Sequence, residues 1–284
     1  MLLIDSIPQM QRTADELRIN GKRIGFVPTM GALHQGHLDL IRTAAQTCDT
    51  VVVSVFVNPS QFGKGEDLSR YPRNLERDQG LAADAGCDIL FVPDADAIYP
   101  EGFCTWVQVE GLGGLLEGAF RPTHFRGVTT VVTALFNIVK PHLAVFGQKD
   151  AQQALIIRRM VRDLHMDIEL HIAPTRRESD GLAMSSRNTY LSDSERERAL
   201  ALSRALTLAE AAFRGGERDA RILRESVQNE LRSGGVDTVD YVALVDAENL
   251  EELEWIEQRA ALLAIAARVG TTRLIDNTIL KVTE

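Results

Sequence analysis

The sequence predicts an α/β fold, in which a doubly wound parallel sheet is followed by a second, smaller α+β domain. Apolar, β-branched runs alternate with helical patterns at a spacing of about 30 residues, which is typical of βαβ units. One run, 50–57, has no polar alternation, as expected for a central strand covered on both faces. After Pro174 the sequence changes to a polar connector and long helical patterns. We therefore expect a Rossmann-like domain over residues 1–175 and an α+β domain over residues 176–284.

The predicted elements can be placed in order along the chain. The strands of the first domain are expected at 24–27, 50–57, 88–92, 143–146 and 168–172. Proline at position 59 stops strand pairing after the second of these runs. In the second domain, helices at 192–215 and 219–233 precede strand-like segments at 238–244, 260–269 and 272–277. The first of these helices opens with Ser192-Asp193-Ser194-Glu195, which fits an N-cap with acidic residues in the first turn.

Composition limits the classes of function. The chain has 284 residues, of which 45% are hydrophobic and 25% charged, so it is globular and long enough for an enzyme of two domains. A formal net charge of -9 argues against a nucleic-acid-binding surface, which is usually basic. Cys48, Cys87 and Cys104 lack the spacing of a zinc or redox site and are expected to be buried thiols of a reducing compartment.

The same sequence lacks the usual targeting signals. The segment 1–8 has no basic leader, and its apolar start meets acid and proline too early for a signal peptide. No segment offers the roughly 18 apolar residues that a membrane span requires. We therefore expect a cytoplasmic protein.

The most informative motif is His34-Gln35-Gly36-His37, which lies between the predicted strand 24–27 and the amphipathic helix that follows it. A four-residue match is weak alone, because exposed histidines are common in loops. The setting of strand, glycine-containing loop and helix start changes this, since free N–H groups and the helix dipole make an anion site there. Two imidazoles three residues apart could then bind a phosphoryl group.

A second group of residues follows the strand 50–57. In an open α/β sheet, ligands bind beyond the carboxyl ends of the strands, so Asn58 and its successors should lie beside the histidine motif. The polar segment 61–73 that follows can be read as a closing lid or as a plain surface connection.

Two further motifs could bind phosphate. Gly147-Gln148-Lys149-Asp150 follows a strand and opens a helix, where glycine permits close approach and lysine supplies positive charge. A solvated Lys-Asp pair is the alternative there. Met184-Ser185-Ser186-Arg187-Asn188 offers hydroxyls and a guanidinium that could clamp a triphosphate.

Four segments, taken together, resemble the pantothenate synthetase family of the H-I-G-H nucleotidyltransferase superfamily. They are PTMGALHQGH at 28–37, FVNPSQF at 56–62, FGQKD at 146–150 and MSSRN at 184–188. The resemblance implies a two-domain, homodimeric, cytoplasmic ligase of pantothenate biosynthesis, the supply of a coenzyme A precursor. It implies condensation of pantoate with β-alanine, with ATP and Mg2+, through a pantoyl adenylate, and release of AMP and pyrophosphate.

The resemblance also implies roles for individual residues. His34 and His37 would steady the charge that builds on the α-phosphate, with His37 as the proton donor, while Lys149 and Arg187 would act on the phosphates. Arg176 stands where the family's backbone touches adenine. The implied ATP-binding residues are Met30, Gly31, Ala32, Leu33, His34, Gln35, Gly36, His37, Gly147, Gln148, Lys149, Asp150, Arg176, Met184, Ser185, Ser186 and Arg187.

The remaining implied residues concern the other substrates and the metal. Gln61 and Gln153 would hold pantoate through amide hydrogen bonds, Gln61 would also reach β-alanine, and Asn58 would help to shape the site. Asp78 matches the family's acidic residue near magnesium.

One residue and one segment have roles that the family resemblance leaves open. Gln148 stands where many members have glutamate, which matters only if the carboxylate rather than the main chain contacts the nucleotide. His124-Phe125-Arg126-Gly127 also matches the family, and packing or a subunit contact is as reasonable for it as catalysis.

Other functions remain as rivals. Another H-x-G-H nucleotidyltransferase, adenylylating or cytidylylating a small acceptor, would share both histidines but should not need the amides of Asn58, Gln61 and Gln153. A fragment of a class I aminoacyl-tRNA synthetase is disfavoured by the acidity of the chain. A non-catalytic nucleotide sensor has no evident reason to keep both histidines and Lys149.

Overall fold

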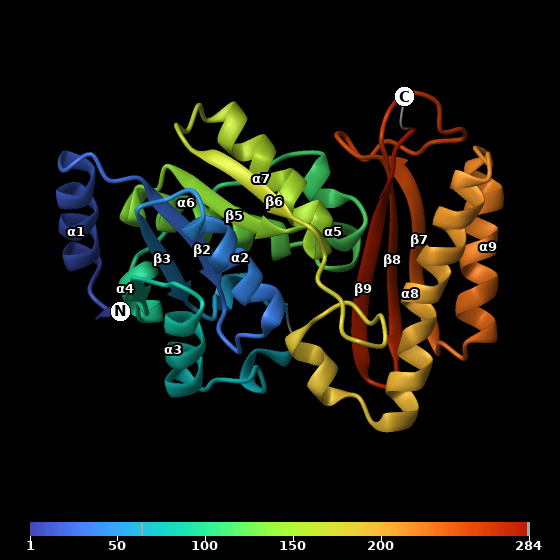
Figure 1. The fold of residues 1–284 in the computed structure, drawn as a ribbon, viewed down its shortest axis with the longest axis horizontal. Coiled ribbons are helices and arrows are strands. Elements are labelled where there is room, and N and C mark those ends of the chain that lie inside the picture. Colours follow the sequence, from blue (N-terminus) through green and yellow to red (C-terminus); the bar gives the residue numbers. More distant parts are fainter. Residues whose placement is uncertain (64, 283–284) are drawn as a thin grey trace. The chain divides into compact units, whose positions relative to one another are not determined.

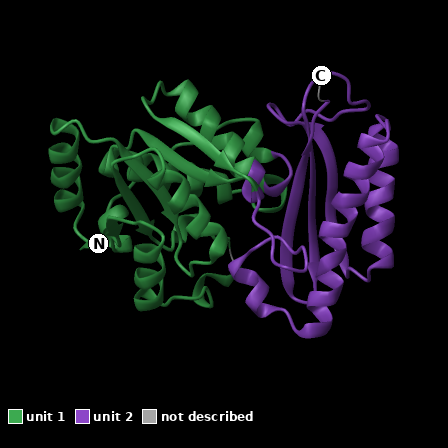
Figure 2. Cartoon of the chain, viewed as in Figure 1, with its two compact units in different colours: residues 1–114, 118–148, 152–174 green, residues 115–117, 149–151, 175–284 purple. Residues whose placement is uncertain are grey.

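The computed structural model describes residues 1–63 and 65–282, which form two compact units (Figures 1 and 2). Unit 1 comprises residues 1–114, 118–148 and 152–174, and unit 2 comprises residues 115–117, 149–151 and 175–284. Lys64, within the segment 61–73 considered as a lid, lies outside the described residues.

A parallel sheet forms the centre of unit 1. Its strand order is β1-β4-β3-β2-β5-β6, and every neighbouring pair runs parallel. The prediction of an α/β fold with a parallel sheet is thereby confirmed. The strands are β1 (Leu2–Ile4), β2 (Ile24–Thr29), β3 (Thr50–Val55), β4 (Ile89–Phe91), β5 (Leu143–Gly147) and β6 (Glu169–Ala173).

The registers of the central strands align their carboxyl ends. Ile24 of β2 pairs with Thr50 of β3, and the pairing continues to Thr29 and Val55. On the other side of β2, Gly25 pairs with Leu143 of β5. The loops that follow β2, β3 and β5 therefore leave the sheet at the same edge.

Helices cover both faces of this sheet, which makes it doubly wound. Side chains of α1 and α6 pack in one hydrophobic core, and side chains of α2 and α3 pack in another on the opposite side of the strands. The helices are α1 (Ile7–Ile19), α2 (Gln35–Ala45), α3 (Leu75–Asp84), α4 (Ala95–Ile98), α5 (Glu117–Phe120), α6 (His124–Val139) and α7 (Ala151–Asp163). Short 3-10 turns occur at η1 (Pro59–Gln61), η2 (Asp67–Ser69), η3 (Leu112–Gly114) and η4 (Gln148–Asp150).

Unit 2 is built on an antiparallel sheet of order β7-β8-β9, so that β9 is an edge strand. Its elements are η5 (Ser186–Tyr190), α8 (Asp193–Arg214), α9 (Ala220–Ser233), β7 (Thr238–Asp246), β8 (Ala261–Val269) and β9 (Thr272–Leu280). Apolar side chains of α8 and α9 pack on one face of the sheet. These elements confirm the predicted smaller α+β fold.

The predicted cap of α8 is also present. The Ser192 N–H donates to Glu195 Oε2 at 2.9 Å, and the Glu195 N–H donates to Ser192 Oγ at 3.4 Å. This reciprocal capping box satisfies N–H groups that the helix itself leaves without an acceptor.

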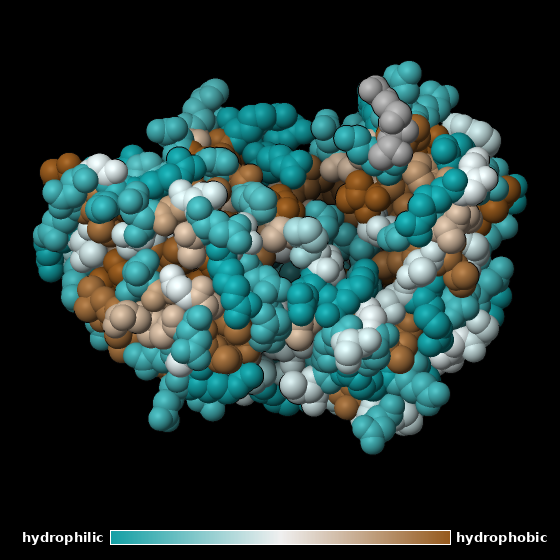
Figure 3. All heavy atoms as spheres, viewed as in Figure 1, coloured by the Kyte–Doolittle hydropathy of each residue, from teal (hydrophilic) through white to brown (hydrophobic). Residues whose placement is uncertain are grey.

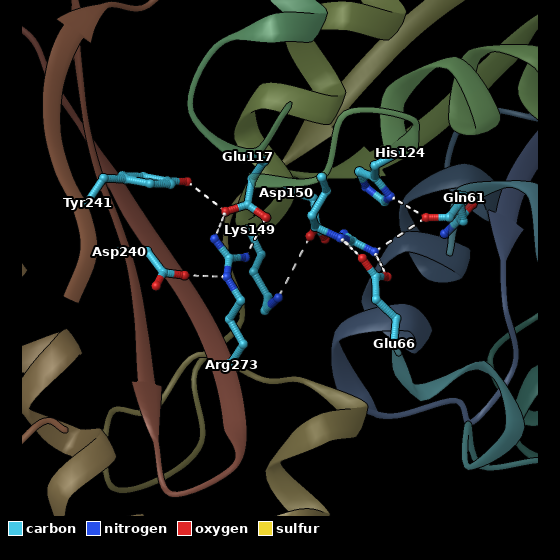
Figure 4. A network of polar contacts seen from close by, with 10 residues as sticks. Gln61, Glu66, Glu117, His124, Lys149, Asp150, Asp240, Tyr241 and Arg273 are labelled. Carbon is cyan, nitrogen blue, oxygen red and sulfur yellow. Dashed lines mark hydrogen bonds and ion pairs between the residues drawn. The ribbon is translucent and has the colours of Figure 1, made fainter. Parts of the chain in front are cut away.

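A buried charge cluster fastens residue 117 within unit 2 (Figure 4). Arg273 of β9 donates to both Glu117 oxygens at 2.6 and 2.7 Å and to Asp240 at 2.6 Å, while the Tyr241 hydroxyl donates to Glu117 at 2.9 Å. Burial, reinforced by the Glu117 carboxylate, raises the pKa of Tyr241. The cluster explains why Leu115–Glu117 belongs to unit 2 although its neighbours in sequence belong to unit 1.

The cysteines correct one expectation. All three are free thiols, but only Cys87 is buried, whereas Cys48 is half-buried and Cys104 is exposed. Burial raises the pKa of the Cys87 thiol to about 12, so this group stays protonated and unreactive. The expectation of buried thiols was therefore wrong for Cys48 and Cys104, since the spacing of cysteines in the sequence carries no signal of burial.

The visible surface mixes polar and apolar side chains (Figure 3). Within residues 1–63 and 65–282, no helix is both long and apolar enough to cross a membrane.

Candidate active site

A buried carboxylate fixes the loop that follows β2. Both Asp78 oxygens accept backbone N–H bonds, from Ala32 at 2.8 Å and from Leu33 at 2.7 Å. Asp78 lies on α3 and is 1% exposed. The loop needs this support because Ala32 has a φ of 51°, in the left-handed region that side chains other than glycine disfavour.

Gly31 allows the tight approach of this loop to Asp78. Its φ is 81°, and a Cβ placed there would lie 3.0 Å from both Asp78 Oδ2 and Val55 Cγ1. The Gly31 N–H donates to the Thr29 hydroxyl at 3.1 Å, and that hydroxyl donates to the Ser54 carbonyl of β3 at 2.7 Å. The loop is therefore shaped before any ligand arrives.

His34 and His37 stack at the start of α2. Their ring centroids lie 4.0 Å apart with an interplanar angle of 25°. His34 is the N-cap, and its backbone N–H donates to His37 Nδ1 at 3.4 Å. Because Nδ1 accepts, a neutral His37 ring carries its proton on Nε2, where it can be donated.

The setting of the two rings favours an anion. The first N–H groups of a helix have no acceptor within it, and the helix dipole places partial positive charge at the same end. The N–H groups of Ala32 and Leu33 already donate to Asp78. An anion would therefore bind to the N–H groups at the start of α2.

The amides after β3 meet the histidine loop. The Asn58 side chain is 1% exposed; its Nδ2 donates to Gln61 Oε1 at 3.0 Å, and its Oδ1 accepts from the Tyr99 hydroxyl at 2.8 Å. Gln61 Nε2 in turn contacts Met30 Sδ at 3.1 Å. The structure thus brings together Asn58, Gln61 and the predicted ATP loop. Asn58 is placed to orient Gln61.

The start of α6 holds the backbone of Gln61 (Figure 4). His124 Nδ1 lies 2.9 Å from the Gln61 carbonyl oxygen, and an Arg121 N–H donates to the same oxygen at 3.4 Å. Arg121 also forms a bidentate ion pair with Glu66 at 2.8 and 2.5 Å. Burial tends to raise the pKa of Glu66, but the Arg121 guanidinium outweighs it and the net shift is downward.

Gly127 lets α6 approach this turn closely. A Cβ at position 127 would lie 2.5 Å from the Ser60 carbonyl oxygen and 2.7 Å from the Gln61 nitrogen. The Gly127 carbonyl accepts from Asn58 Nδ2 at 3.2 Å. The segment His124–Gly127, whose role the sequence left open, is therefore a support for Asn58 and Gln61.

The loop after β5 carries the next predicted residues. Gly147 ends β5 and Gln148 follows it in unit 1, at the same edge of the sheet as the histidine loop. Gln153 lies in the first turn of α7, also in unit 1. Lys149 and Asp150 belong to unit 2, with Lys149 Nζ 3.8 Å from Asp150 Oδ1 (Figure 4).

The remaining predicted residues lie on a hairpin and turn of unit 2. The Met184 N–H donates to the Arg176 carbonyl at 2.9 Å, and Ser185 caps η5 by accepting from the Arg187 N–H at 3.3 Å. Asn188 Nδ2 donates to Glu178 Oε1 at 2.6 Å and so ties the turn to the hairpin. Arg176, Met184, Ser185, Ser186 and Arg187 therefore belong to one supported segment.

Two ion pairs stiffen this hairpin. Arg196 of α8 donates to Glu178 at 2.6 Å and to Asp180 at 2.7 Å. Desolvation raises the pKa of Asp180, but the Leu182 N–H and the Arg196 guanidinium outweigh it, and the net shift is downward.

The donor groups limit how a metal could bind. Among the described residues, no three His, Cys, Asp or Glu side chains are grouped so that they could hold an ion. Asp78, the predicted magnesium residue, is buried and both of its oxygens accept N–H bonds. The protein groups therefore suit Mg2+ only as a companion of phosphate, with water and phosphate oxygens as its main ligands.

Comparison with known proteins identifies the family. The sequence profile described as pantoate-beta-alanine ligase matches residues 2–279. The chain belongs to the pantoate–β-alanine ligase family. The resemblance found in the four sequence segments is thereby confirmed.

Individual members of the ligase family match over their whole length. A pantothenate synthetase of Pelotomaculum thermopropionicum is 55% identical over 280 residues, which cover 99% of each chain. A crystal structure of pantoate-beta-alanine ligase (pantothenate synthetase) from Thermus thermophilus superposes with a TM-score of 0.93 at 46% identity, covering 99% of this chain and 100% of that one. The Francisella tularensis ligase, solved in complex with beta-gamma ATP and beta-alanine, has a TM-score of 0.82 at 33% identity, covering 100% and 99%.

Sequence reasoning missed the residues that support the site. Arg121 and Tyr99 contact Gln61 and Asn58, yet neither stands in a segment that carried the resemblance. Asp78 was predicted as a residue near magnesium, but its contact with the loop was not predicted. Each of these contacts joins residues separated by 41 to 60 positions, so spacing in the sequence carries no signal for them.

Proposed function

We propose that the chain condenses pantoate with β-alanine in an ATP-dependent reaction that forms pantothenate, AMP and pyrophosphate. The observation that carries the proposal is the contact of Gln61 with Met30, because it joins a substrate-binding amide to the loop that bears His34 and His37. Membership of the pantoate–β-alanine ligase family supports the same reaction.

The reaction needs no nucleophile from the protein. The pantoate carboxylate attacks the α-phosphorus of ATP, pyrophosphate leaves, and pantoyl adenylate forms. The amine of β-alanine then attacks the acyl carbon, and AMP leaves as the amide bond forms. The protein contributes position and charge stabilisation.

The histidines act on the α-phosphate. His37 donates a hydrogen bond from Nε2 to a phosphate oxygen as charge builds there, and its Nδ1 is held by the His34 N–H. The stacked His34 ring keeps the His37 ring in this orientation. The first N–H groups of α2 add further positive potential.

The amides select the acid and the amine. Gln61 and Gln153 hold pantoate through its hydroxyl and carboxylate groups, and Gln61 also contacts β-alanine. Asn58 keeps Gln61 in place through the Nδ2 bond to its side chain. In this assignment residues 1–175 bind pantoate and part of the nucleotide.

Residues of the C-terminal unit act on the nucleotide. Lys149 and Arg187 bind its phosphates, together with the hydroxyls of Ser185 and Ser186, and Asp150 lies near the ribose. The Arg176 main chain contacts adenine. The domain over residues 176–284 thus clamps ATP.

Magnesium enters with ATP in this proposal. It neutralises phosphate charge, and its main ligands are phosphate oxygens and water. A contribution of Asp78 to the ion remains a prediction, whereas its bonds to the loop support a positioning role. We further propose, from the family resemblance, a cytoplasmic homodimer, whose mass sedimentation equilibrium would measure.

One assay separates this function from its rivals. The enzyme is given ATP, Mg2+ and pantoate, with and without β-alanine, and AMP is followed. We expect sustained AMP release only with both pantoate and β-alanine. AMP formation indifferent to both would overturn the proposal, and transfer of AMP or CMP to a phosphorylated acceptor would favour another nucleotidyltransferase.

A further inference from the structure

The edge strand β9 carries two adjacent polar residues that the proposed reaction does not use. Asp276 is 2% exposed and Asn277 is 5% exposed. Side chains alternate along a strand, so the two residues point to opposite faces of the sheet. Each of them binds a different segment of unit 2.

Asp276 holds the hairpin that leads to Arg187. Its two oxygens accept from the Arg177 guanidinium at 2.7 and 3.1 Å in a bidentate ion pair. Arg177 also donates to the Gly181 carbonyl at 3.2 Å, so the pair fixes the turn of the hairpin. Arg177 is adjacent to Arg176, whose carbonyl accepts from the Met184 N–H. The ion pair therefore fixes the hairpin at whose base Arg176 pairs with Met184, next to the predicted phosphate-binding residues.

Asn277 holds the segment that carries Lys149. Its Nδ2 donates to the Lys149 carbonyl oxygen at 2.8 Å. The Asn277 N–H donates to Asp276 Oδ1 at 2.8 Å, so the two anchors are linked directly. Lys149–Ala151 belongs to unit 2, although the residues on both sides of it belong to unit 1.

We infer that Asp276 and Asn277 are positioning residues for ATP, because one edge strand fixes the spacing between Lys149 and the segment 176–187. The inference rests on the proposed function for the identity of the ligand. Neither residue has a role in the proposed chemistry itself, and their observed partners are protein groups. Their effect is transmitted through the main chain of Lys149 and the guanidinium of Arg177.

The test compares the effect of each variant on the binding of ATP with its effect on the KM values for pantoate and β-alanine. Asn277→Ala removes the donor to Lys149, and Asp276→Asn removes the charge opposite Arg177 while keeping the shape. We expect each variant to raise the KM for ATP and the Kd for a non-hydrolysable ATP analogue about 10-fold, a usual scale for one lost buried hydrogen bond. The KM values for pantoate and β-alanine should change by less than about twofold.

Thr278→Val is the matched control. Thr278 follows Asn277 on β9 and lies on the same face as Asp276, but its hydroxyl donates to Glu210 of α8 and to neither segment. The Thr278→Val variant should change Tm without changing the KM for ATP or the Kd for the ATP analogue. A second pair, Arg177→Gln with Asp276→Asn, replaces the ion pair by an amide pair and should restore part of the ATP affinity that Asp276→Asn alone loses.

The outcomes distinguish the two proposals. Folded Asn277→Ala and Asp276→Asn proteins with wild-type ATP constants, or with equal losses for all three substrates, would overturn the positioning role. A wild-type enzyme that binds the ATP analogue but releases no AMP with pantoate and β-alanine would overturn the proposed function instead. In that case the analogue Kd still tests the two residues.

Discussion

At the scale of single residues, Asp78 determines the shape of the loop before His34. One carboxylate accepts two consecutive N–H groups of a loop that contains two residues with positive φ. A neutral amide cannot replace it, since its NH2 group would face an N–H donor. A lost buried acceptor costs about 1–3 kcal/mol.

The first prediction follows from that contact. Asp78→Asn should lower the free energy of unfolding by about 1–3 kcal/mol and slow adenylate formation, because the loop no longer holds the start of α2. Chemical denaturation and single-turnover pyrophosphate release measure the two effects. Asp84→Asn, at the other end of α3, is the control. Unchanged kinetics in Asp78→Asn would mean that the loop holds its shape without this acceptor.

A second prediction concerns His37. His37→Ala should reduce the single-turnover rate of adenylate formation by about 10² or more, the range for a lost electrostatic catalyst. The Kd for pantoate should stay near the wild-type value, because the assigned pantoate contacts are Gln61 and Gln153. An unchanged rate would leave His37 with a structural role only, as the partner of His34.

At the scale of elements, the approach of α6 to η1 decides where Gln61 lies. The two elements meet at Gly127, where any Cβ would overlap the backbone of Ser60 and Gln61. The same helix supplies His124 to the Gln61 carbonyl. The turn that carries Gln61 is therefore held by packing as well as by hydrogen bonds.

The third prediction tests this packing. Gly127→Ala should destabilise the protein by about 1–3 kcal/mol, the usual cost of overpacking, and should raise the KM for pantoate by moving Gln61. Gly80→Ala is the matched control, since Gly80 lies within α3 with nothing inside 4 Å of its added Cβ. It should be neutral or stabilise the protein by about 0.5–1 kcal/mol. A Gly127→Ala enzyme with the wild-type KM for pantoate would contradict the support assigned to α6.

Periodicity in the sequence was sufficient for the long elements. The buried strands and the helices α8 and α9 follow from hydrophobic runs and caps, which are local signals. β1 was missed because its three residues are too few to show a period and its partner β4 lies far along the chain. β3 also ends at Val55 instead of Val57, before the proline that was expected to stop it.

Motifs in the sequence identified the candidate site but not its supports. His34, Gln61 and Lys149 stand in segments whose residue types suit phosphate and small polar ligands. Asn277 and Arg273 bind partners 128 and 156 positions away, and no local pattern encodes such pairs. Supports of this kind become visible only once the chain is folded.

At the scale of the whole molecule, unit 1 has a hydrophobic core on each face of its sheet, unit 2 has one of its own, and ionisable groups tie strands together in unit 1. The Ile24 N–H of β2 donates to His142 Nδ1 at 3.0 Å, just before β5 begins. Burial lowers the pKa of His142 below its ordinary value of 6.5, and the nearby Arg18 and Arg23 charges lower it further. The folded protein therefore favours the neutral ring, whose Nδ1 can accept.

The fourth prediction is a loss of stability on acidification in two stages. The pKa of His142 is lower in the folded than in the unfolded state. The contribution of the neutral ring to the free energy of unfolding is therefore complete above pH 6.5, and it is lost as the pH falls through the pKa of the folded state. Glu66 and Asp180 also have lowered pKa values, and their contributions are lost at more acidic pH, below the ordinary values of 4.5 and 3.8. Chemical denaturation from pH 8 to 2 should show a first decline in the free energy of unfolding that starts near pH 6.5 and a second one below about pH 4.5. His142→Asn, which keeps an acceptor for Ile24 but cannot titrate, should abolish that first decline and leave the acidic one. The same first decline in wild type and in His142→Asn would assign it to other groups.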